Sequence, residues 1–95
     1  MKAKIIVQMV HEGLTDLTHG GGYQVKRLVV EEKNNLAITP DDNQLYAIIG
    51  FDLRNDYEVI GEVEVPDDLV EKALAFVRAK AEFDGLKGTF EALLG

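Results

Sequence analysis

Four side chains of the kinds that bind transition metals stand close together near the start of the chain. Within nine residues the sequence places two imidazoles and two carboxylates, at His11, Glu12, Asp16 and His19. Zn²⁺ and similar ions take these ligand types. His11-Glu12 lacks the second histidine, four residues after the first, that completes the helical zinc motif. The same residues also suit an ordinary polar surface loop, so a metal site is one of two interpretations.

A run of glycines follows directly, at Gly20, Gly21 and Gly22. Consecutive glycines can turn several backbone N–H groups toward a phosphate or another anion. Such a site would need a helix that begins at Tyr23, and Lys26 or Arg27 would complete the charge match. The run lacks the lysine of a phosphate-binding loop and the acidic partner of a dinucleotide site, which favours a flexible connector instead. Residues 11–22 therefore carry an alternative hypothesis, a small ligand- or metal-binding domain.

Two residue types that supply catalytic nucleophiles are missing from the sequence. The chain contains no Cys and no Ser. A disulfide, a thiolate zinc site, a cysteine nucleophile and serine hydrolase chemistry are therefore excluded within this chain. No recognised catalytic motif takes their place, so we expect a non-enzymatic protein without a cofactor.

Negative charge is concentrated in the middle of the chain. The whole sequence has a net charge of −7, which argues against direct binding to nucleic acid or to anionic lipid. Residues 41–71 contain ten acidic residues and one base, Arg54, so this segment alone has a net charge of −9. Within it we expect four residues to contact a partner: Glu58, Ile60, Glu62 and Glu64. This pattern fits a basic protein partner, and the competing interpretation is a solvated sheet face.

The elements that would position these groups begin with a strand. Alternating apolar residues predict a central or nearly central strand over residues 2–10, and this run is too short for a signal peptide or a membrane span. Residues 23–33 fit a strand better than the alternative helix. Asn34-Asn35 suits left-handed backbone and predicts a tight hairpin into residues 36–38, which Pro40 would end.

A second hairpin is predicted downstream. Residues 45–53 and 57–65 are β-rich runs on either side of Arg54-Asn55-Asp56, and we expect them to pair with each other. Strict alternation in the second run would place four residues on one packed face: Val59, Gly61, Val63 and Val65.

The end of the chain is predicted to be helical. Asp68 stands three residues before Glu71, which is the spacing of a capping box, and apolar residues then recur at helical intervals as far as Phe83. Gly85 would stop this helix. Thr89 would cap a last short turn that packs against the core.

Together these elements predict one domain, residues 1–95, of the α+β class. We expect an antiparallel or mixed sheet of about four or five strands with the amphipathic helix packed on one face. The core is thin, with no Trp, so a homo-oligomer would help to stabilise it. The lack of Cys fits a cytoplasmic protein. The leading functional hypothesis is a small interaction or regulatory domain that meets a basic partner through residues 41–71.

Overall fold

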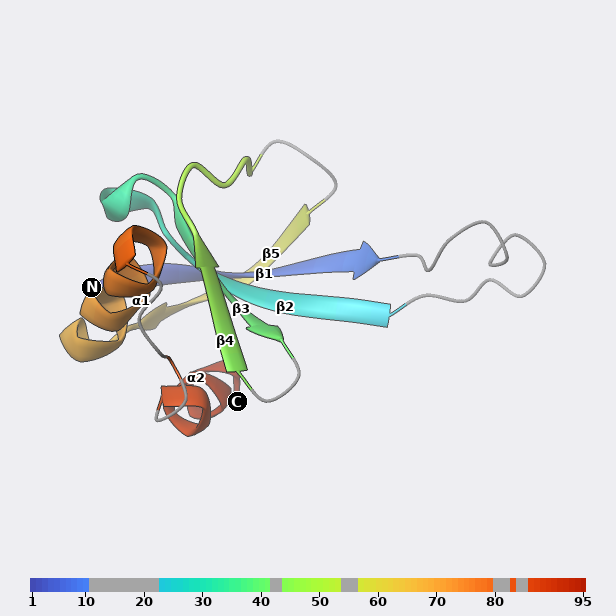
Figure 1. Ribbon diagram of the computed structural model, residues 1–95. Helices are drawn as coiled ribbons and strands as arrows, with labels where there is room; N and C mark the ends of the chain where they lie inside the picture. Colours follow the sequence, from blue (N-terminus) through green and yellow to red (C-terminus); the bar gives the residue numbers. More distant parts are fainter. Residues whose placement is uncertain (11–22, 42–43, 54–56, 80–82, 84–85) are drawn as a thin grey trace.

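One five-stranded antiparallel sheet and two α-helices form the α+β fold of this protein, as the sequence predicts (Figure 1). The computed structural model describes residues 1–10, 23–41, 44–53, 57–79, 83 and 86–95. The strands are β1 (Lys2–Val10), β2 (Tyr23–Val30), β3 (Leu36–Asp41), β4 (Gln44–Ile48) and β5 (Tyr57–Glu64). The helices are α1 (Asp67–Ala79) and α2 (Lys87–Leu94).

The strand order in the sheet is β4-β3-β2-β1-β5. Strands β1 to β4 are neighbours in the order of the chain, and β5 then pairs with β1 at the far edge. The predicted hairpin between residues 45–53 and 57–65 is therefore wrong, because β4 pairs with β3 and β5 pairs with β1. The prediction of a nearly central first strand is confirmed, since β1 has a neighbour on each side.

A turn after β4 explains why the predicted hairpin does not form. Gly50 has φ +71°, a left-handed conformation that glycine adopts without a steric penalty. Its N–H donates to the carbonyl of Asn34 at 2.7 Å, and the N–H of Phe51 donates to the carbonyl of Asn35 at 3.1 Å. These bonds turn the chain away from β4, so the next strand forms at the opposite edge of the sheet.

The Asn34-Asn35 turn itself is confirmed. Both residues are left-handed, with φ 57° and 50°, and the short 3₁₀ helix η2 (Glu31–Lys33) precedes them. The favoured strand prediction for residues 23–33 holds as far as Val30. Strand β3 does not end before Pro40 but continues to Asp41. Pro40 is tolerated because the pairing of β3 with β2 stops at Ile38, so only β4 is its neighbour there.

The main core lies between the sheet and the two helices. The sheet contributes Leu28, Leu36 and Ile38 among its fully buried side chains, and α1 contributes Leu69, Val70 and Ala73. Phe90 of α2 is also fully buried in this cluster. Burial of this apolar surface is the main favourable term for the fold. The predicted packing of the end of the chain against the core is thereby confirmed for Phe90.

A second, smaller core covers part of the opposite sheet face. Ile6, Val29 and Ala37 are fully buried there beneath Phe51, which is 7% exposed. Leu53 and Tyr57 pack against the same cluster. The segment that follows β4 therefore covers part of the sheet face opposite the helices.

The helix ends differ from the predicted ones. Helix α1 begins at Asp67, one residue before the expected cap, and Asp68 accepts a hydrogen bond from the N–H of Leu69 at 2.9 Å. Phe83 lies outside the helix, and the predicted stop at Gly85 falls outside the described residues. Thr89 is inside α2 and is not its cap, because α2 already begins at Lys87.

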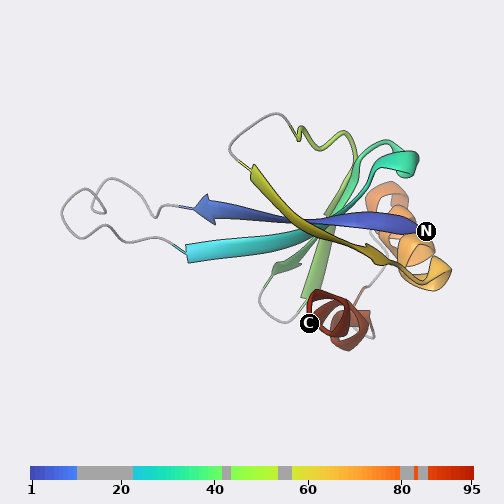
Figure 2. The ribbon, with the colours of Figure 1, turned by 180° about the vertical axis from the view of Figure 1, so that it is seen from behind.

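The described ends of β1 and β2 extend beyond the rest of the sheet, as Figures 1 and 2 show from opposite sides. Their pairing continues to Val10 and Tyr23, whereas β3 pairs with β2 only over Leu28–Val30. Among the described strands, residues 23–27 of β2 pair with β1 alone. β1 in turn pairs with β5 as far as Gln8, so a two-stranded ribbon is formed by residues 9–10 and 23–24.

Candidate protein interaction site

The outer edge of β5 is the most exposed part of the predicted partner-binding segment. Among the described strands, none pairs with β5 on the side away from β1. Glu58, Ile60, Glu62 and Glu64 are all exposed, and the neighbouring Val59 is 51% exposed. An open strand edge offers unpaired backbone N–H and C=O groups to another chain. These four residues therefore lie where a partner strand could reach them.

A bulge divides this strand into two parts. Ile5 lies opposite Gly61 and the next residue of β1, Ile6, lies opposite Val59, so Ile60 has no direct partner on β1. One extra residue reverses the alternation of side chains on either side of it. Val59 consequently lies on the face of Ile6 and the second core, whereas Val63 lies on the face of Ala3 and the main core. The prediction that Val59 and Val63 share one face is wrong for this reason.

The same bulge separates the glutamates. Glu58 lies opposite Val7 and therefore on the face that carries the helices. Glu62 and Glu64 lie opposite Lys4 and Lys2 on the other face. The structure thus brings all three carboxylates to one edge but places them on both sides of the strand, which corrects the expectation of a single acidic face.

Lys4 and the amino group of Met1 lie close to glutamates of β5. Lys4 Nζ lies 2.8 Å from Glu31 Oε1, and this hydrogen bond and ion pair, with a smaller contribution from Glu62, raise the pKa of Lys4 above its ordinary value. Glu64 Oε1 lies 3.1 Å from the amino nitrogen of Met1. Glu62 and Glu64 therefore face bases on their inner side. On the outer side of β5, away from β1, the described residues form no strand.

Further acids continue from the end of β5 into α1. Asp67, Asp68 and Glu71 are all exposed. Acidic residues in the first turn also stabilise a helix through its macrodipole. These residues therefore have a structural role of their own, and they extend the negative surface beyond β5.

The residues of the alternative site are only partly described. His11, Glu12, Asp16 and His19 lie outside the described residues, as do Gly20, Gly21 and Gly22. Tyr23 begins strand β2 and not the helix that the anion site required. Lys26 and Arg27 are adjacent in this strand, so they point to opposite faces. Ligand or metal binding by residues 11–22 stays a prediction.

Arg27 already has partners within the fold. Its Nη1 donates to Gln8 Oε1 at 2.7 Å, and its guanidinium lies 5.4 Å from the centre of the Phe51 ring. The ring centroids of Phe51 and Tyr57 are 4.8 Å apart in the same cluster. Arg27 therefore packs over the second core, and its exposed neighbour Lys26 does not.

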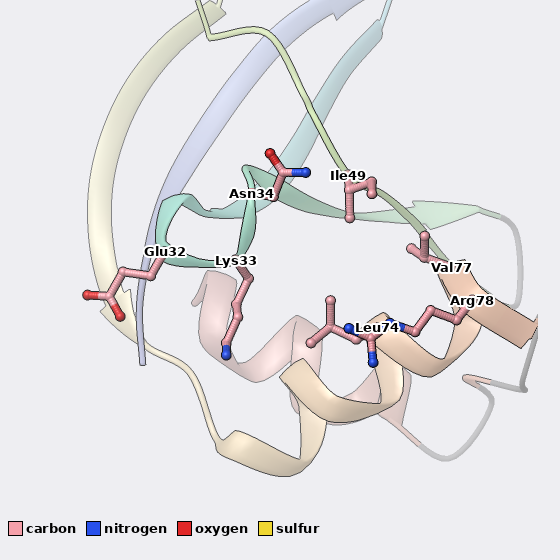
Figure 3. Close-up of a pocket in the computed structure, with 7 residues that line it drawn as sticks. All are labelled: Glu32, Lys33, Asn34, Ile49, Leu74, Val77 and Arg78. Carbon is pink, nitrogen blue, oxygen red and sulfur yellow. The ribbon is translucent and has the colours of Figure 1, made fainter.

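A hollow near the β4 edge of the sheet, opposite the β5 edge, was not predicted from the sequence. It has a volume of about 330 Å³ and lies between η2 and α1 (Figure 3). Lys33 and Arg78 are the cations that line it, together with Leu74 and Val77 of α1 and Ile49. Residues so far apart in the chain give no signal in local spacing, and only the fold brings them together.

Within the described residues, neither helix has the length and apolar character that crossing a membrane requires. Comparison with protein-family models finds no family that matches this chain, and comparisons with curated proteins and with solved structures find no match either.

Proposed function

We propose that this protein is a non-enzymatic interaction domain that binds a basic, extended segment of a partner protein along β5. The observation that carries the proposal is the combination of an unpaired strand edge, half-exposed Val59 and Ile60, and three exposed glutamates. Addition of a strand to an open sheet edge is a common mode of peptide recognition. Backbone hydrogen bonds supply affinity in this mode, and alternate side chains supply specificity.

The bulge at Ile60 defines the kind of segment that would fit. A strand beside β5 would meet Glu58 on one face and Glu62 and Glu64 on the other. Its bases would therefore have to point to both faces. An apolar residue between them would cover Val59 and Ile60, which are each about half exposed. Such complementarity would favour rapid and salt-sensitive association.

A synthetic peptide tests the proposal by fluorescence anisotropy. It carries a fluorophore and the sequence Lys-Val-Val-Lys-Val-Lys, whose adjacent valines place lysines on both faces of a strand. Replacing Glu58, Glu62 and Glu64 together with Gln should weaken binding about tenfold, because three exposed ion pairs contribute about 0.2–1 kcal/mol each. The salt dependence of the dissociation constant should also decrease. Chemical shift changes in labelled protein should be largest at the amides of β5.

A matched variant controls for total charge. Replacing Glu32 and Glu91 with Gln removes exposed carboxylates that lie outside residues 41–71, and this variant should bind within about twofold of the original protein. A peptide N-methylated at every residue should lose binding, because it has no backbone N–H group to donate to β5 from either edge. Equal weakening by the two sets of Gln substitutions, or full binding of the N-methylated peptide, would reject strand addition at β5.

A further inference from the structure

A groove runs between the edge strand β4 and helix α1, at the opposite edge of the sheet from β5. The hollow of about 330 Å³ beside Lys33 and Arg78 forms one end of it. A second hollow of about 490 Å³ shares Ile49 and Val77 with the first and continues to Tyr46 and Phe76. Two adjoining hollows of this size fall within the range of small-molecule sites.

One end of the groove is cationic. Lys33 is half-buried and Arg78 is exposed, and in the part of the chain that the structure describes neither side chain has an ion pair. Figure 3 shows both side chains beside Leu74, whereas the carboxylate of Glu32 points away from them. Because the described residues provide no ion-pair partner for these two cations, they are available to an external anion, in a chain whose net charge is −7.

The other end of the groove is apolar. Tyr46 is 49% exposed and Ile49 is 46% exposed, although each has a large hydrophobic side chain. The ring of Tyr46 meets that of Phe76 edge to face, with centroids 5.5 Å apart. None of the described residues that line this hollow is charged. Clustered apolar surface beside a helix is typical of a binding groove.

We infer that this groove binds a small amphipathic carboxylate, with its carboxylate beside Lys33 and Arg78 and its apolar body along Ile49 and Val77 toward Tyr46. A peptide fits less well. If the terminal carboxylate of a peptide lay beside Lys33 and Arg78, the peptide would run parallel to β4, because this end of the groove adjoins the end of β4 at Ile49. Parallel strand pairing is less stable than antiparallel pairing. The site is at the opposite sheet edge from β5 and does not depend on the proposed partner binding.

Titration of isotope-labelled protein with sodium octanoate, followed by NMR, tests the inference. The amides of residues 46–49 and 74–78 should shift together and saturate. Acetate provides the charge without the apolar body, and octan-1-ol provides the apolar body without the charge. Both should bind at least about tenfold more weakly, because each lacks one half of the recognition.

Matched substitutions on and off the groove make the test specific. Lys33→Gln and Arg78→Gln should each weaken octanoate binding by about fivefold. Lys72→Gln removes an exposed cation from the same helix but outside both hollows, and it should leave binding unchanged. The triple Gln variant of β5 should also bind octanoate normally, which separates this test from that of the proposed function.

Three results would overturn the inference. The first is equal weakening by Lys72→Gln, which would mean attraction to bulk charge. The second is octan-1-ol binding as tightly as octanoate, which would leave no role for the cations. The third is that the groove binds a short apolar peptide with a free terminal carboxylate but does not bind octanoate, which would make it a peptide site.

Discussion

Phe51 is the side chain that closes the second core. It covers Ile6, Val29 and Ala37 on the sheet face opposite the helices. Truncating a buried phenylalanine leaves a cavity and typically costs several kcal/mol. We therefore expect Phe51→Ala to lower the free energy of unfolding by about 3 kcal/mol in urea denaturation.

Tyr46→Ala is a matched aromatic control for that measurement. Tyr46 is 49% exposed and its main aromatic contact is with Phe76. Its removal should cost only about 1 kcal/mol, the scale of one aromatic pair. Equal losses from the two variants would show that the second core adds little stability.

Some residues could be predicted from the sequence because their signals are local. Asn34 and Asn35 tolerate left-handed backbone, and the structure places both of them there. Val25 to Val30 was recognisable as strand from its β-branched residues. Lys33 and Arg78 gave no such signal, because they become neighbours only through the packing of α1 against β3 and β4.

At the level of the elements, the bulge in β5 determines which residues share a face. Deleting Ile60 should leave the observed pairs on both sides of it intact, including Ile5 with Gly61 and Ile6 with Val59. We expect this deletion to cost no more than about 1 kcal/mol of unfolding free energy. Denaturant titration with far-ultraviolet circular dichroism measures it.

Deleting Val63 is the corresponding control, because it removes one residue from the regular part of the same strand. Glu64 would then take the place of Val63 opposite Ala3, on the main core face. A carboxylate at this place would be desolvated without a partner. We therefore expect the free energy of unfolding to fall by about 3 kcal/mol or more. If deletion of Ile60 were the more damaging change, the assignment of the bulge would be wrong.

The strands themselves were more predictable than their partners. Alternating apolar residues indicated β1 and β5, whereas nothing local indicated that these two strands pair. The predicted hairpin failed because the turn at Gly50 is held by bonds to Asn34 and Asn35, which belong to another part of the chain. The bulge at Ile60 was also invisible, since its residue types fit regular alternation equally well.

On the scale of the whole molecule, the sheet has a protected centre and two open edges. β1 has a paired strand on each side over most of its length, whereas β2 and β3 are paired on both sides at Leu28–Val29 and Ala37–Ile38. Hydrogen exchange should therefore be slowest at residues such as Ile6, Val29 and Ala37, which are also fully buried. Alternate amides of β4 and β5 should exchange quickly, because they point away from the sheet.

Protein concentration gives this exchange experiment a second use. If the predicted homo-oligomer forms through either edge, the outward amides of that strand should become protected as concentration rises. Uniform protection along β4 or β5 at low concentration would contradict the open edges.

The pairing of β1 with β5 has a consequence for synthesis on the ribosome. Met1 and Val65 exchange two hydrogen bonds, of 2.9 and 2.6 Å, across a separation of 64 residues. At a translation rate of about 5–20 residues per second, β5 is synthesised several seconds after β1. During that interval the nascent meander of β1 to β4 exposes the outer side of β1 to other chains. Slow codons placed after β4 would lengthen this interval, and a holding chaperone would then bind β1, the strand of this sheet that is translated first.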